Sequence, residues 1–234
     1  MDKRFPVLTS RQTRGERRFA LVWLFVHIVL LPPALLWLLP ALGLGEEYAD
    51  FARYAVGAAV LLCGSWGFLR RDFDPLCDRP GLCILQVLSC YCSILCFDLF
   101  LNSLLLLFFD VGENPNNAAV WELTGVSFGT TAAMAIFLAP LVEELLFRGA
   151  VFGGLYGKSR RWAYIVTTVA FALYHVAGYA LLDPRFLVFA LQYLPAGYLL
   201  CRCYELTDSI WSPIFLHMLV NAVSVAAMDK AGAP

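Results

Sequence analysis

The sequence predicts an all-α fold, a polytopic bundle of transmembrane helices. The composition is the first indication, because 60% of the 234 residues are hydrophobic and only 15% are charged. Soluble domains average about 45–50% apolar and about 25% charged residues. The second indication is a series of apolar runs that are long enough to cross about 30 Å of hydrocarbon, which takes about 20 helical residues.

Seven such runs follow one another along the chain. They lie near residues 19–44, 54–69, 81–109, 127–157, 162–182, 186–204 and 210–228. Pro32, Pro33 and Pro40 interrupt the first run, so we expect a kink or a re-entrant break there. A second crossing hidden in that run would raise the count to eight, and the second run is short for a span. The expected division of the chain is a basic N-terminal segment (1–18), N-terminal transmembrane helices (19–126) and a C-terminal transmembrane core (127–228), whose polar motifs are described below.

The basic residues predict the orientation. Most Lys and Arg residues precede the first span or follow the second, fourth and sixth spans, for example Arg17, Arg70 and Arg160. Cytosolic loops are enriched in Lys and Arg. We therefore expect a cytosolic N-terminus, an external acidic loop at 110–117 and a location in the cell (inner) membrane of a bacterium.

Two carboxylates and a guanidinium lie within the fourth run, in Glu143-Glu144-Leu145-Leu146-Phe147-Arg148. Such groups cost about 2.5–3.5 kcal/mol each at the centre of a spanning helix, so they indicate a functional site. Residues four apart share a helix face, whereas neighbours diverge by about 100°. Arg148 is therefore expected to pair with Glu144 as a supporting ion pair, which leaves Glu143 as the free carboxylate.

Two further polar pairs have helical spacing, namely Phe171 with His175 and His217 with Asn221. If the fourth helix continues to about residue 157, Glu143 and His175 lie at similar depths in the membrane. We therefore predict the longer helix and a single water-filled cavity on which Glu143, His175, His217 and Asn221 converge. Phe171 is expected to be a packing residue.

Such a cavity can support the addition of water to a carbonyl group. Glu143 can take a proton from water, and His175 can orient that water or pass the proton to the leaving amine. His217 and Asn221 can donate hydrogen bonds to the oxyanion that forms.

The order Glu-Glu-x-x-x-Arg, Phe-x-x-x-His and His-x-x-x-Asn on three helices resembles the three signature motifs of the CPBP family, the CAAX prenyl endopeptidases and bacteriocin-processing (Abi) enzymes. The resemblance covers residues 127–228. It implies an intramembrane endopeptidase in which Glu143 is the general base, His175 its partner and His217 with Asn221 the oxyanion stabilisers. It also implies a membrane-bound protein or peptide as the substrate, a CAAX-type or C-terminal sorting tail or a leader peptide.

The need for a metal is left open by the sequence. Glu143, His175 and His217 could hold zinc with a water as fourth ligand. The metalloprotease signature H-E-x-x-H is absent and the chain has three His, so a metal-free glutamic mechanism without cofactor is favoured. A non-enzymatic transporter and an immunity or scaffold protein are the alternatives of another class. The expected partners are the substrate and the lipid bilayer and no nucleic acid, and the oligomeric state is not predicted.

Overall fold

The computed structural model describes residues 8–108 and 112–230, and within them all regular structure is helical. Lys3 and Arg4 of the basic segment and Asp110 and Val111 of the acidic loop lie outside the described residues. Seven helical stretches are long and apolar enough to cross a membrane, which confirms the predicted integral, multi-pass, all-α protein. They are Arg14–Ala41, Glu46–Arg71, Pro80–Phe108, Pro115–Tyr156, Arg160–Ala180, Pro184–Thr207 and Trp211–Met228.

These stretches divide into α-helices and short segments of other helical type. The N-terminal part has α1 (Arg14–Phe25), the π-helical η1 (Val26–Leu30), α2 (Leu31–Ala41), the 3₁₀-helical η2 (Glu46–Tyr48), α3 (Ala49–Arg71), α4 (Asp74–Asp78) and α5 (Pro80–Phe108). The fourth span has α6 (Pro115–Ala132), the π-helical η3 (Ala133–Leu138), α7 (Ala139–Glu143), the π-helical η4 (Glu144–Phe152) and α8 (Gly153–Tyr156). The remaining elements are α9 (Arg160–Ala180), the 3₁₀-helical η5 (Pro184–Phe189), α10 (Ala190–Thr207) and α11 (Trp211–Lys230).

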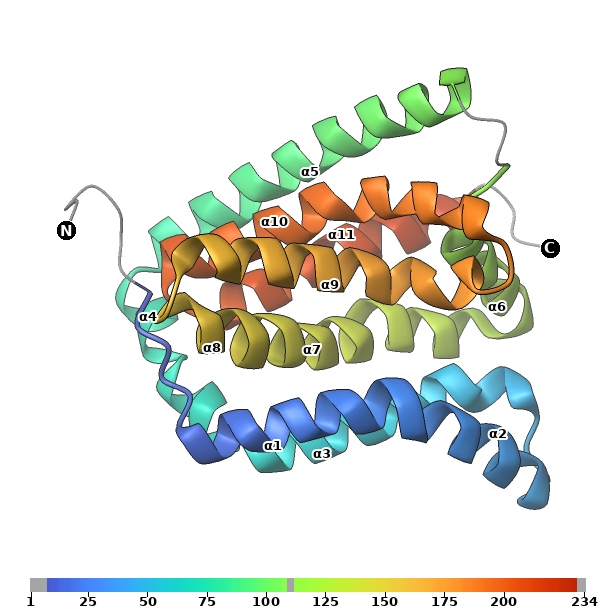
Figure 1. Ribbon diagram of the computed structural model, residues 1–234, viewed down its shortest axis with the longest axis horizontal. Helices are drawn as coiled ribbons and strands as arrows, with labels where there is room; N and C mark the ends of the chain where they lie inside the picture. The colour runs from blue at the N-terminus through green and yellow to red at the C-terminus, as the bar shows by residue number, and fades with distance from the viewer. Residues whose placement is uncertain (1–7, 109–111, 231–234) are drawn as a thin grey trace.

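The fourth span is the central element of the bundle. Figure 1 shows α7 and α8 between the layer of α1 and α3 and the layer of α9, α10 and α11, and the contacts between these elements agree. Every residue from 142 to 150 is buried. A helix that is buried all round needs neighbours on every side. The central position therefore follows from the N-terminal spans on one face and the C-terminal spans on the other.

Three details differ from the expectations. The first run contains no re-entrant break, because it stays helical through Pro32, Pro33 and Pro40, with the π-helical η1 just before the first two prolines. The second span is not short, since its helix extends beyond the apolar run at both ends. The fourth span begins at Pro115 inside the predicted loop, and its helix is interrupted at Ser127 before it continues to Tyr156. The predicted long fourth helix is confirmed.

Asp72 joins three parts of the chain at the end of the bundle where the described chain begins. Its carboxylate accepts hydrogen bonds from the backbone N–H of Ile210 (2.6 Å) and from the guanidinium of Arg11 (3.3 Å). The same Arg11 guanidinium forms an ion pair with Asp208 (3.0 Å). The Asp72 carboxyl is buried, and this burial raises its pKa from 3.8 to about 7 despite the neighbouring donors.

This raised pKa predicts that Asp72 makes the stability depend on pH. The folded state binds the Asp72 proton more tightly than the unfolded chain, so the contribution of this group falls as the pH rises from about 4 to about 7, by up to roughly 1.4 kcal/mol per pH unit. In Asp72→Asn the amide oxygen can still accept from Ile210. We expect the difference in unfolding free energy between this variant and the parent, measured in micelles, to change over that pH range. Parallel pH profiles would contradict the assignment.

Candidate active site

Glu143 lies at the junction between α7 and η4, where its carboxylate faces the interior of the bundle. One oxygen, Oε1, accepts a hydrogen bond of 2.8 Å from the hydroxyl of Tyr54 on α3. The other, Oε2, is buried without a hydrogen-bond partner. It lies 3.7 Å from Nε2 of His175 and 4.0 Å from Nε2 of His217. The prediction of a wholly free carboxylate is therefore correct for one oxygen only.

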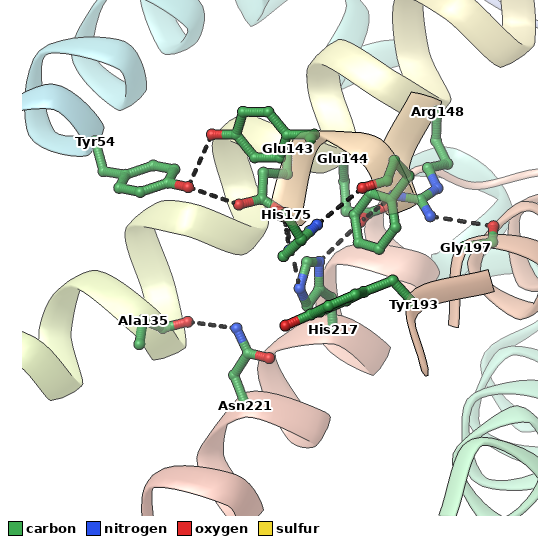
Figure 2. A network of polar contacts seen from close by, with 12 residues as sticks. Tyr54, Ala135, Glu143, Glu144, Arg148, His175, Tyr193, Gly197, His217 and Asn221 are labelled. Carbon is green, nitrogen blue, oxygen red and sulfur yellow. Dashed lines mark hydrogen bonds and ion pairs between the residues drawn. The ribbon is translucent and has the colours of Figure 1, made fainter. Parts of the chain in front are cut away.

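Glu144 and Arg148 form the predicted ion pair, with 2.8 Å between Oε1 and Nη1 and no exposure of either side chain. Nη2 of Arg148 also donates to the carbonyl of Gly197 (3.1 Å), and the guanidinium lies over the ring of Phe171 (4.2 Å). The same Oε1 of Glu144 accepts a hydrogen bond from Nδ1 of His217 (2.9 Å). Glu144 therefore links the ion pair to the second histidine, as Figure 2 shows.

His175 on α9 is oriented by its own helix and by aromatic rings. Its Nδ1 lies 2.9 Å from the carbonyl oxygen of Phe171, which can only accept, so Nδ1 carries the proton. Nε2 then faces Oε2 of Glu143 with its lone pair when the ring is neutral. The ring of Tyr193 stacks on His175 at 4.4 Å, and Phe171 contacts it from another side. The predicted packing role of Phe171 agrees with these contacts.

Asn221 lies one turn beyond His217 on α11, farther from the carboxylates than the two histidines (Figure 2). One N–H of its amide donates to the carbonyl of Ala135 in η3 (2.8 Å), which fixes the orientation of the side chain. An amide nitrogen has two N–H donors, so a second remains for another acceptor.

All four predicted catalytic side chains line one cavity of about 350 Å³. Its outer wall includes Asp50 at the start of α3 and Asn116 at the start of α6. The other ends of these two spans lead into the basic residues Arg70, Arg71 and Lys158. The cavity therefore belongs to the half of the bundle opposite the arginine-rich helix ends.

Two contributors to this site could not be predicted from the sequence. Tyr54 comes from an N-terminal span without a polar motif, and its hydroxyl also contacts the hydroxyl of Tyr174 (2.9 Å). Tyr193 is one of many aromatic residues in apolar runs. His27 in η1 is buried, with its ring 5.3 Å from that of Tyr54.

Tyr54→Phe is expected to lower kcat about tenfold with little change in KM. The substitution removes the only donor to Oε1 of Glu143 that the described residues provide, and a hydrogen bond to a charged group contributes about 1.5–3 kcal/mol. Tyr174→Phe is the matched control, because it keeps the contact between Tyr54 and Glu143. Kinetics of both variants on one substrate check this, and equal losses in both would contradict a positioning role of Tyr54.

A catalytic zinc ion would need three protein ligands grouped around it. Within 8–108 and 112–230, no three His, Cys, Asp or Glu side chains are grouped closely enough to hold a metal ion. The zinc alternative would require Glu143, His175 and His217 to hold the ion together. Since the side chains do not fit as they stand, no step of the chemistry below is assigned to a metal.

Comparison with known proteins gives two matches. The model of the family described as "Type II CAAX prenyl endopeptidase Rce1-like" matches residues 125–223. This range contains all three motifs. The match agrees with the resemblance of residues 127–228 to the CPBP family, and residues 125–223 are called the CPBP segment below. The CPBP segment thus includes every side chain predicted for the site, whereas Tyr54 lies outside it.

A relative extends the similarity beyond the CPBP segment. The protein named "Putative membrane peptidase YdiL" of Bacillus subtilis (strain 168) is 27% identical over 150 residues, which is 63% of this chain. The match covers 57% of that protein, so a large part of the relative has no counterpart in the alignment. No solved structure matches the chain.

Proposed function

We propose that this protein is an intramembrane endopeptidase that hydrolyses a peptide bond of a membrane-tethered substrate with a water activated by Glu143. The observation that carries the proposal is the convergence of a partnerless carboxylate oxygen with two imidazole Nε2 atoms inside one cavity. The Rce1-like match of the CPBP segment and the name of the relative support the same class of reaction.

In the proposed mechanism, a water binds between Oε2 of Glu143 and Nε2 of His175. Glu143 takes one proton from this water while the oxygen attacks the scissile carbonyl carbon. The resulting oxyanion accepts hydrogen bonds from the remaining amide N–H of Asn221 and from Nε2–H of His217 in its doubly protonated form. The C–N bond then breaks, and the proton passes through Glu143 or His175 to the leaving amine.

The supporting groups act through these residues. Glu144 accepts from Nδ1 of His217, and a carboxylate at that position orients the ring and stabilises the imidazolium that donates to the oxyanion. Arg148 compensates the buried charge of Glu144. The mechanism is a metal-free glutamic one, and the zinc alternative is decided by the experiment below.

The substrate is proposed to reach the site from outside the cell. The positive-inside rule assigns the arginine-rich helix ends to the cytosol of a bacterium, and the cavity lies in the opposite half of the bundle. An exported leader peptide or a C-terminal sorting segment fits that side better than a CAAX tail in the cytosol.

The test is cleavage of quenched, apolar peptides by the full chain in liposomes. Cleavage by the parent that survives exhaustive chelation would support a glutamic protease. Loss on chelation with recovery after addition of zinc would overturn the metal-free mechanism. If the parent cuts no peptide of a broad membrane-peptide library, the endopeptidase proposal fails, and a transporter or scaffold role takes its place.

A further inference from the structure

Asp98 is a charged residue of the cavity wall that the proposed mechanism does not use. It lies in the membrane-spanning α5, one turn from Ile94 and one turn from Asn102, and all three line the cavity. Asp98 is half-buried, and it makes no hydrogen bond or ion pair with any residue in the described part of the chain. A carboxylate at such a depth without a partner is costly, so it indicates a functional role.

The pairing of α5 with the antiparallel α10 gives the level of Asp98 in the bundle. At one end of the contact the thiols of Cys90 and Cys203 face each other, and at the other Nε2 of Gln192 donates to Oδ1 of Asn102. In an antiparallel helix pair, the numbers of two residues that face each other add up to a nearly constant value, as they do for these two pairs. By the same relation, Asp98 is level with Ala196.

This level is that of the active site. Ala196 lies between Tyr193, which stacks on His175, and Gly197, whose carbonyl binds Arg148. Ala196 also lines the cavity. A group bound to Asp98 would therefore lie about one helical turn or less from the level of the catalytic side chains.

The other charges of the cavity do not balance Asp98. Arg53 lines the cavity too, but its guanidinium forms an ion pair with Asp50 (2.9 Å) and lies over the ring of Tyr54 (4.6 Å). The third carboxylate of the wall, Glu143, is the proposed base. The cavity is thus negative in character near Asp98 and favours a cation.

We infer that Asp98 binds a positively charged group of the substrate, either a Lys or Arg side chain or the α-ammonium of a peptide N-terminus, close to the scissile bond. This inference rests on the proposed function and names its substrate class: apolar, membrane-tethered peptides that carry a cation beside the cleavage site. The ion pair forms only when substrate is bound, so Asp98 contributes specificity rather than stability of the free protein.

The test uses pairs of apolar peptides that differ only in Arg against citrulline, which has the same shape without the charge. Binding is measured first, to the full chain carrying Glu143→Gln in nanodiscs, so that no cleavage is needed. We expect the best Arg peptide to bind about tenfold or more tightly than its citrulline partner, because a hydrogen bond between two charged groups is stronger than one to a neutral donor. Adding Asp98→Asn should remove the difference and leave citrulline binding unchanged.

Asp78→Asn is the matched control, because Asp78 is an exposed carboxylate at the end of α4, away from the cavity. It should keep the full preference. Acetylation of the peptide N-terminus distinguishes the two cations: it abolishes tight binding only if the α-ammonium is the bound group. The inference would be overturned if neither the Arg peptide nor the free N-terminus bound more tightly than its neutral counterpart. It would also be overturned if the preference persisted in Asp98→Asn.

Two further measurements keep the outcomes separate. The thermal midpoint of Asp98→Asn should equal or exceed that of the parent, because the substitution removes an unpaired charge from the membrane. A protein with Glu143 intact is then assayed for cleavage of the same peptides. Charge-dependent binding without any cleavage would refute the endopeptidase proposal and leave standing only the binding of a cation by Asp98.

Discussion

Glu143→Gln is expected to lower kcat by about 10²–10⁴-fold, the range that a positioned general base contributes. The amide keeps the size of the side chain and can still accept from the hydroxyl of Tyr54 through its oxygen, so the fold of the site should persist. It cannot take a proton from water at Oε2, the atom that faces both histidines. The measurement is the steady-state rate of cleavage in liposomes at saturating substrate.

The control for this prediction is Glu46→Gln, the same chemical change in the exposed η2. It should cleave at the parental rate. KM should change little in Glu143→Gln, because the carboxylate acts on water rather than on the substrate. An unchanged kcat in Glu143→Gln would remove Glu143 from the role of base, and a lower thermal midpoint would show that the loss was structural.

Arg148→Met is expected to lower the free energy of unfolding by about 3–5 kcal/mol, the cost of leaving one partner of a buried ion pair without compensation. Glu144 would then retain a fully buried charge whose remaining contact is His217. The carbonyl of Gly197 would also lose its donor. The measurement is denaturant unfolding in micelles, with Arg70→Met at the exposed end of α3 as the control.

The double variant Glu144→Gln/Arg148→Met separates stability from catalysis. Removing both charges should recover part of the lost stability, because no buried charge remains unpaired. Cleavage should stay low, because His217 no longer has a carboxylate at Nδ1. Full activity in the double variant would contradict the role given to Glu144, and a fully stable Arg148→Met would contradict the ion pair.

Much of the site could be predicted from the sequence because helical spacing determines which side chains share a face. Glu144 with Arg148 is one such pair, and the depth argument for a long fourth helix correctly brought Glu143 level with His175. The ionisable residues stood out because the surrounding runs are so apolar. The roles of these residues in catalysis stay predictions.

The remaining features depend on contacts between spans that are distant in the sequence. Tyr54 is a single tyrosine in an apolar helix, and only packing of α3 against α7 brings it to Glu143. The bond from His217 to Glu144 requires the relative rotation of two helices. The start of the fourth span at Pro115 was missed because Asn116 and Asn117 resemble loop residues, although the Asn114 side chain caps this helix.

The π-helical segments on either side of α7 have a consequence for the comparison of relatives. A π-helical turn corresponds to an α-helix with one extra residue, and such turns are frequent at functional sites. A relative that lacks η3 or η4 would carry one residue fewer there. Its inward-facing residues would align with those of this chain only if the alignment contained a gap of one residue. The Glu-Glu-x-x-x-Arg motif begins at the last residue of α7 and continues into η4, so ungapped alignments of the fourth span would pair residues that point in different directions. Gaps of one residue within 133–138 or 144–152 should therefore be read as changes in helix type rather than as sequencing or alignment errors.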